Sequence, residues 1–203
     1  VPRENDDEGI ERPAVIDLGD YFVDKEAFTS IYSKHHETTV VKIETDTGIV
    51  GWGEAQSPVS PRTTQTIVED LVRPMILGRD PFDIEAIWTR NYGAMRERGH
   101  PTGFYVDAIG GTDIALWDIV GKATGKPVHK LAGGRYRDKV KLYAGMGGTD
   151  PEKVADLAEE HVGYGYRALK LHLLLDADGV AEIARAVRKR IGPDIMLMCD
   201  VHM

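Results

Sequence analysis

Titratable side chains occupy alternate positions in two short segments near the end of the 203-residue chain. Lys170 and His172 are two residues apart, and so are Asp200 and His202. Because successive side chains of a β-strand point to opposite faces, each pair would share one face of its strand. A single lysine, histidine or aspartate at a strand end is most often solvated or part of a turn. Two pairs with the same spacing instead favour a functional site.

The segments that carry these pairs have the pattern of a parallel sheet. Strands are predicted at Val140–Ala144, Arg167–His172 and Ile195–His202, and helices starting at Asp150-Pro151 and at Asp178 separate them. Strands that alternate with helices of this length form parallel sheets. In an α/β barrel the carboxyl ends of such strands carry the active site. The four titratable side chains are therefore expected to line one cavity.

Three parallel strands and two helices do not make a finished architecture, because such a sheet needs both faces covered and its edges protected. The chain is therefore expected to be part of a longer protein, interrupted after a third barrel strand. Cys199 lies on the face of its strand opposite Asp200 and is predicted to be buried by packing rather than to act in catalysis.

The first two thirds of the chain have a different pattern. Thr38–Ala55 has the pattern of a β-hairpin with a glycine turn at Gly48, and Val15–Val23 is predicted to form a third strand. Three helices are expected to follow, the first over about residues 63–77 with Pro74 bending or shortening its end. The second is expected to start at Asp80-Pro81, and the third to run over about residues 105–124.

Composition excludes several classes of protein. The net charge of −8 argues against a nucleic-acid-binding surface, which would carry a basic patch. No apolar run approaches the roughly 20 residues that cross a bilayer, so no membrane partner is expected. The single cysteine excludes an intramolecular disulfide and a multi-thiolate metal site. A reducing, cytoplasmic location is the simplest interpretation.

Two motifs carry a resemblance to a known family. The segment DAIGGTDIALWDIVGKATGKPVHKLAGG (Asp107–Gly134) resembles the hallmark segment of the mandelate racemase and muconate-lactonizing branch of the enolase superfamily. The segment VVKIETDTGIVGWGEA (Val40–Ala55) resembles the capping-domain hairpin of that branch. The resemblance implies an α+β capping domain over residues 1–137, followed by a partial α/β (TIM-type) barrel over residues 138–203 that is truncated after its third strand.

The resemblance also implies a chemistry, namely abstraction of the proton α to a carboxylate to give an enediolate, with Mg²⁺ as cofactor. Lys170 matches the first lysine of the family's Lys-x-Lys motif and would polarise the substrate carboxylate, and Asp200 matches the first Mg²⁺ ligand. His172 stands where the family has its second lysine, which puts a lysine base in doubt. Asp200-Val201-His202 resembles the Asp-x-His of some sugar-acid dehydratases, in which the histidine takes part in acid–base catalysis, a role that its near-neutral pKa suits.

The function expected from these features is dehydration of an aldonic or aldaric sugar acid to a 2-keto-3-deoxy acid. A racemase, epimerase or cycloisomerase on the same scaffold is an alternative, because the first half-reaction is shared. A non-catalytic, truncated paralogue that acts as a binding or structural module is another. This 203-residue fragment by itself is expected to be inactive. The resemblance further implies a homo-oligomer.

Overall fold

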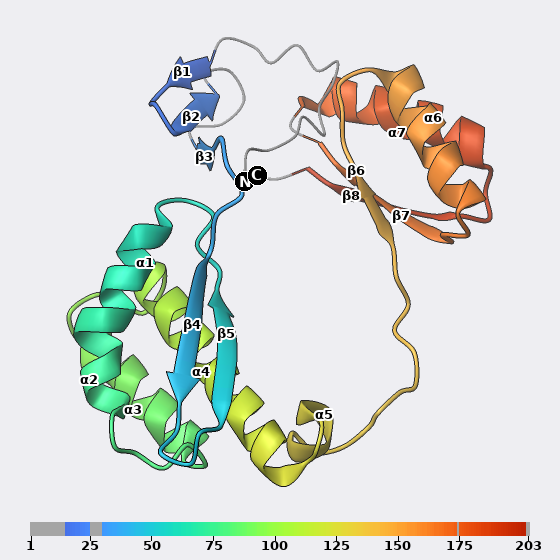
Figure 1. The fold of residues 1–203 in the computed structure, drawn as a ribbon. Helices are drawn as coiled ribbons and strands as arrows, with labels where there is room; N and C mark the ends of the chain where they lie inside the picture. Colours follow the sequence, from blue (N-terminus) through green and yellow to red (C-terminus); the bar gives the residue numbers. More distant parts are fainter. Residues whose placement is uncertain (1–14, 25–29, 174, 202–203) are drawn as a thin grey trace. The chain divides into compact units, whose positions relative to one another are not determined.

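The computed structural model describes residues 15–24, 30–173 and 175–201, and these residues form two compact units. One unit contains Tyr32–Tyr136. The other contains the chain from Arg137 on, together with strands β1 (Val15–Asp17) and β2 (Tyr21–Asp24) (Figure 1). None of the helices in these ranges has the length and apolar character needed to span a membrane.

The N-terminal strands differ from the prediction. Val15–Val23 does not form one strand, because Gly19 adopts a left-handed conformation (φ 82°) and the Leu18 amide donates to the Tyr21 carbonyl at 2.9 Å. The resulting strands, β1 and β2, pair antiparallel with each other. A short strand, β3 (Ile31–Ser33), follows. None of these strands joins the predicted hairpin, whose sheet has two strands among the residues that the structure describes.

That hairpin is confirmed. β4 (Thr39–Glu44) and β5 (Val50–Ala55) pair antiparallel from Thr39 opposite Ala55 to Glu44 opposite Val50. Gly48 has a φ of 82°, a value that glycine adopts at no steric cost and that other residues rarely do. On one face Val41 and Ala55 are buried, whereas Val40, Lys42 and Trp52 on the other face are exposed.

The predicted first helix is present but interrupted. It consists of α1 (Pro61–Ile67), a π-helical turn η1 (Val68–Val72) and α2 (Arg73–Ile76). Pro74 has no amide hydrogen for the helical hydrogen bond to the residue four positions earlier, and this explains a change of hydrogen-bond pattern directly before it. The predicted bend is therefore a change of helix type.

The next helix, α3 (Ile84–Arg96), starts later than predicted, with Asp83 at its N-cap position. The Asp80 carboxylate instead accepts a hydrogen bond from the Phe82 amide at 2.9 Å, so Asp80 and Pro81 belong to a turn. The long helix α4 (Phe104–Thr124) matches its prediction and ends at Gly125, which has a φ of 62°. A short helix, α5 (Val128–Leu131), follows.

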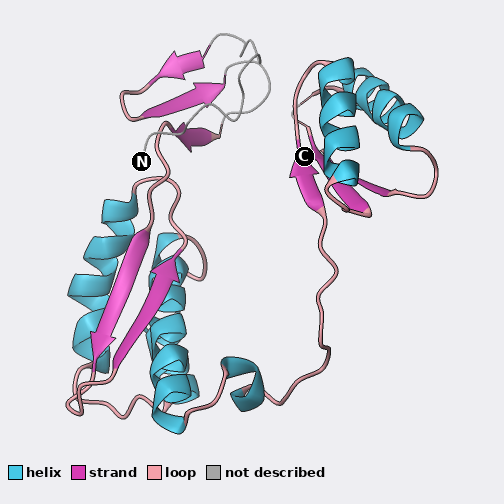
Figure 2. Cartoon of the chain, turned by 45° about the vertical axis from the view of Figure 1, so that its right-hand side comes forward, coloured by secondary structure: helices cyan, strands magenta, loops and turns pink. Residues whose placement is uncertain are grey.

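Glycines bring α4 unusually close to β5, as Figure 2 shows for the helix running beside the hairpin. A Cβ added at Gly51 or Gly53 would collide with backbone atoms of α4, and one added at Gly111 would lie 2.8 Å from the backbone nitrogen of Ala55. The Asp118 carboxylate of α4 also accepts a hydrogen bond from the Trp52 amide at 2.9 Å. This contact fixes the hairpin on the core that α3 and α4 share.

The second unit has the predicted strand–helix alternation. Strands β6 (Ala144–Met146), β7 (Ala168–His172) and β8 (Met196–Asp200) form a parallel sheet in that order. Helices α6 (Pro151–Gly163) and α7 (Ala177–Ile191) connect them and pack on each other. The core of this unit is apolar and includes Leu169, Leu171, Ile183 and Val187.

Of three element boundaries in this unit, two differ from the prediction and one agrees with it. β6 starts at Ala144, because it pairs with β7 only from that residue on, and Val140 is 70% exposed. Asp150 caps α6 as predicted, accepting bonds from the amides of the first turn. The N-cap of α7 is Asp176 rather than Asp178, because the Asp176 carboxylate accepts the Gly179 amide at 2.9 Å.

Candidate active site

The alternation of β7 separates a packing face from a polar face. Leu169 and Leu171 are fully buried in the apolar core of the second unit. Lys170 and His172 lie on the other face, Lys170 partly buried and His172 exposed at the carboxyl end of the strand. The period of two predicted this separation, and the burial of the leucines fixes which face the polar residues take.

β8 brings an acid beside these residues. Asp200, its last residue, is the register partner of His172 on β7, so both lie at the carboxyl ends of neighbouring parallel strands. The Lys170 Nζ atom lies 2.7 Å from the Asp200 Oδ2 atom. The two side chains are 31% and 39% exposed, so water still reaches the pair. Lys170 and Asp200 therefore share one side of the sheet.

The ion pair controls the charge state of the lysine. The pKa of Lys170 is raised above its ordinary value, mainly because the ammonium group donates a hydrogen bond to Asp200. Partial burial opposes this effect, and the charges of Asp200 and Tyr143 add to it. Lys170 is thus a cation and a hydrogen-bond donor at neutral pH, which is the form that can bind a carboxylate oxygen.

Two residues at this site were not identified from the sequence. Tyr143 directly precedes β6 and makes a minor electrostatic contribution to the raised pKa of Lys170. Gly145 is the register partner of Lys170 on β6, and a Cβ added there would meet no atom within 4 Å. The strand beside Lys170 thus leaves open space on that side. Register of β6 on β7 was the signal that could have found Gly145, whereas Tyr143 lies just outside the paired residues.

The glycine-rich segment after β6 has a steric explanation. A Cβ at Gly147 would lie 2.8 Å from the carbonyl oxygen of His172, and Gly148 has a φ of 145°. Small residues are therefore needed for the loop to pass the end of β7.

The other predicted residues have different outcomes. His202 lies outside the described residues, so its place beside Asp200 stays a prediction. Cys199 is exposed, and the prediction that it is buried is wrong. In the described sheet β8 is one of the two edge strands, whereas Leu169 and Leu171 of the central strand β7 are fully buried. Within the described ranges, no group of three or more His, Cys, Asp or Glu side chains could hold a metal ion.

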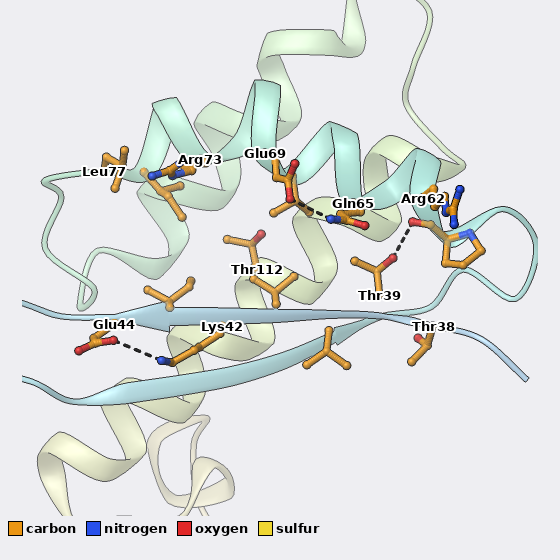
Figure 3. Close-up of a pocket in the computed structure, with 16 residues that line it drawn as sticks. Thr38, Thr39, Lys42, Glu44, Arg62, Gln65, Glu69, Arg73, Leu77 and Thr112 are labelled. Atoms are coloured by element: carbon orange, nitrogen blue, oxygen red, sulfur yellow. Dashed lines mark hydrogen bonds and ion pairs between the residues drawn. The ribbon is translucent and has the colours of Figure 1, made fainter. Parts of the chain in front are cut away.

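The other unit contains a cavity. A groove of about 670 Å³ runs between β4 and the α1–η1–α2 segment (Figure 3). It contains none of the predicted site residues. The predicted chemistry and this groove are therefore separate features of the molecule.

Comparison with known proteins places these features in a family. The family model described as mandelate racemase / muconate lactonizing enzyme, N-terminal domain, matches residues 24–133. D-galactarolactone cycloisomerase of Agrobacterium fabrum is 36% identical over 168 residues, which is 80% of this chain and 43% of that protein. D-galactonate dehydratase of Pectobacterium atrosepticum is 37% identical over 171 residues, 80% of this chain and 44% of that protein.

Comparison with solved structures gives the same family. A member of the enolase superfamily from Agrobacterium tumefaciens superimposes with a TM-score of 0.85 at 33% identity, covering 99% of this chain and 52% of that one. A mandelate racemase/muconate lactonizing protein from Paracoccus denitrificans, complexed with magnesium, gives a TM-score of 0.73 at 30% identity over 81% of this chain and 47% of that one. The chain thus spans about half the length of the proteins it matches.

Proposed function

We propose that this chain, which belongs to the mandelate racemase / muconate lactonizing enzyme family, is the N-terminal part of a Mg²⁺-dependent sugar-acid dehydratase. The observation that carries the proposal is the pairing of Lys170 and Asp200 at 2.7 Å on one side of the sheet, at the carboxyl ends of two adjacent parallel strands. Relatives named as D-galactonate dehydratases support the reaction class.

The proposed architecture is a capping domain over residues 1–137 and the start of an α/β barrel over residues 138–203. The parallel order β6-β7-β8 and the helices α6 and α7 between the strands support this assignment. In such a barrel the carboxyl ends of the strands surround the substrate. Lys170, His172 and Asp200 lie at or near that end of their strands.

The reaction proposed is removal of the proton α to the carboxylate of an aldonic or aldaric acid, followed by loss of the 3-hydroxyl group. Negative charge develops on the carboxylate oxygens as the proton leaves, and a fixed ammonium group stabilises that charge. Lys170 is the group assigned to this role. His202 is assigned to acid–base catalysis, because an imidazole can hold or release a proton near neutral pH. His172, which shares the polar face of β7, is the alternative base.

Asp200 is the one residue of the described chain assigned to Mg²⁺. Its carboxylate is a hard oxygen ligand of the kind Mg²⁺ prefers, and the bound cation would neutralise charge on the substrate carboxylate. One carboxylate with water holds Mg²⁺ weakly. Titration of the 203-residue chain with MgCl₂ in a calorimeter is therefore expected to show no tight site. A stoichiometric, tight site that Asp200→Asn removes would contradict this assignment.

A second candidate function is cycloisomerisation, which the similarity to a D-galactarolactone cycloisomerase favours. The fate of the enediolate distinguishes the two reactions. In the dehydratase the enediolate expels the 3-hydroxyl group as water, whereas in ring opening of a lactone it expels the ring oxygen, and both eliminations give a 2-keto acid. Assay of the natural protein that carries residues 1–203, with D-galactonate and D-galactarolactone in separate reactions with Mg²⁺, separates them by which substrate yields a 2-keto acid.

Variants of that protein test the site. Lys170→Met is expected to lower turnover by roughly 10²–10³-fold, the usual effect of removing one donor that stabilises a developing oxyanion. Lys153→Met, which alters an exposed lysine on α6, is the matched control and should leave turnover unchanged. Full activity of Lys170→Met would refute the assignment.

The two histidines are compared in the same way. His202→Asn is expected to abolish turnover and exchange of the substrate α-proton with solvent deuterium, with substrate binding largely kept. His172→Asn is expected to have the smaller effect. An active His202→Asn enzyme beside an inactive His172→Asn enzyme would reverse the assignment.

A further inference from the structure

Gly145 is the middle residue of β6, and its local structure does not require a glycine. Its φ lies outside the left-handed region, and an added Cβ would meet no atom within 4 Å. The next two glycines differ from it. A Cβ at Gly147 would lie 2.8 Å from the carbonyl oxygen of His172, and Gly148 has a φ of 145°. Glycine in the interior of a strand weakens the strand and often marks a place where a ligand approaches the backbone closely.

The side chain that Gly145 lacks would lie on the polar face of the sheet. Gly145 is the register partner of Lys170, and side chains at paired positions of neighbouring strands share one face. The residues on either side of it, Ala144 and Met146, are buried in the apolar core on the opposite face. Gly145 itself is exposed. The space that it leaves therefore opens beside Lys170, on the side of the sheet that carries the proposed chemistry.

Lys170 does not fill this space, because its side chain is directed toward the other neighbouring strand. β7 lies between β6 and β8, and the Lys170 Nζ atom lies 2.7 Å from the Oδ2 atom of Asp200 on β8. A substrate carboxylate bound by this ammonium group and by a cation at Asp200 would lie between β7 and β8. The rest of the substrate can then extend across β7 toward Gly145.

The spacing of the strands determines how long a substrate must be to reach Gly145. Neighbouring strands are about 4.8 Å apart, so β6 lies about 7 Å to the side of a point midway between β7 and β8. An extended carbon chain advances about 1.3 Å per bond, because bonds of about 1.5 Å are arranged in a zigzag. A six-carbon acid thus covers about 6.5 Å from its carboxyl carbon, whereas a four-carbon acid covers about 4 Å. The longer acid reaches Gly145 and the shorter acid does not.

We propose that Gly145 is a specificity-determining residue, whose missing side chain leaves space for the distal carbons of a six-carbon sugar acid held by its carboxylate at Lys170. This inference rests on the proposed function, because it takes the role of Lys170 as given. A substrate carbon in contact with the backbone at Gly145 would lie about 4 Å from its Cα atom, within the space that a larger side chain would occupy. Such a side chain excludes long acids more than short ones.

Kinetics of the natural protein that carries residues 1–203 test this inference. The probes are D-galactonate and L-threonate, a four-carbon acid with the same configuration at C2 and C3, each assayed with Mg²⁺. Gly145→Val is expected to lower kcat/KM for D-galactonate by about 10–200-fold, the usual effect of a misfit of one methylene group. The loss for L-threonate, measured as substrate or as competitive inhibitor, should be at least about tenfold smaller. Gly145→Ala should show the same preference to a lesser degree.

Stability measurements separate this role from a structural one. Urea unfolding followed by circular dichroism should give an unchanged or higher midpoint for Gly145→Val, because valine is favoured in strands and its Cβ meets no atom. Gly147→Ala should lower the midpoint, because its Cβ would collide with the His172 carbonyl. Gly163→Ala is the matched control for activity. Gly163 ends α6, an added Cβ there also meets no atom within 4 Å, and kcat/KM for both acids should stay unchanged.

Four outcomes would overturn the inference. The first is an unchanged kcat/KM for D-galactonate in Gly145→Val, and the second is an equal loss for both acids. The third is a lower urea midpoint for Gly145→Val, because another segment of the natural protein would then occupy the space. The fourth is a protein without substitutions that neither converts nor binds D-galactonate. Failure of the proposed function gives a different result, namely full activity of Lys170→Met.

Discussion

Replacing Gly111 by alanine is expected to destabilise the first unit, whereas the same change at Gly110 is expected to stabilise it. The two glycines are neighbours in α4, and both lie in its interior. An alanine in the interior of a helix is favoured over glycine by about 0.5–1 kcal/mol. This gain applies to both positions. The atoms around the added methyl group therefore determine how the two variants differ in free energy of unfolding.

Those surroundings are opposite. A Cβ at Gly110 would meet no atom within 4 Å. A Cβ at Gly111 would lie 2.8 Å from both the Cβ and the backbone nitrogen of Ala55, and 3.0 Å from its Cα. Ala55 ends β5 and is itself fully buried, so it cannot move without shifting the hairpin. Overpacking of this kind costs about 1–3 kcal/mol or more. Because the gain from the helix is common to both variants, they should differ by the overpacking cost, about 1–3 kcal/mol or more in free energy of unfolding.

Urea unfolding followed by tryptophan fluorescence is the assay. The protein has three tryptophans, and Trp52, Trp88 and Trp117 all lie in the first unit, so the signal reports that unit alone. Gly110→Ala should raise the urea midpoint and Gly111→Ala should lower it, with similar slopes. Equal midpoints in the two variants would refute the close approach of α4 to β5 as the reason for Gly111.

Two further predictions concern charged groups. The pKa of Asp118 is held below its usual range, first by the hydrogen bond from Lys122 and then by that from the Trp52 amide. Because the folded pKa is depressed, the stability that Asp118 contributes should be fully present above about pH 4 and lost as the pH falls further. Asp118→Asn should cost roughly 1 kcal/mol at pH 7, since the group is partly solvated, and the cost should fall as the pH drops through the folded pKa; an unchanged cost down to the lowest pH at which the protein stays folded would contradict this. Arg190 of α7 contacts three carboxylates of α6, all more than 60% exposed. Because exposed ion pairs contribute little to stability, Arg190→Met should lower the urea midpoint of the second unit only slightly, as followed by circular dichroism. The effect should vanish in about 1 M NaCl, and a large loss that salt does not change would show that the network is not screened.

The amino-acid sequence by itself determined the features that depend on local periodicity and on single residues. Gly48 marks the turn of the hairpin, Gly125 ends α4, and Asp150 followed by proline starts α6. The alternation along β7 is enough to assign Leu171 to the core and Lys170 to the polar face, with no tertiary contact needed. These features follow from dihedral preferences, missing donors and side-chain direction, which neighbouring residues alone decide.

Tertiary structure decided what depends on distant partners. The segment after Val15 forms β1 and β2, which pair with each other and not with β4. The sequence does not determine this pairing, because the apolar alternation of the segment is compatible with either partner strand. Cys199 has the pattern of a buried residue, yet it is exposed in the described structure. The 2.7 Å contact of Lys170 with Asp200 likewise needs the register of β7 on β8, which neither strand determines alone.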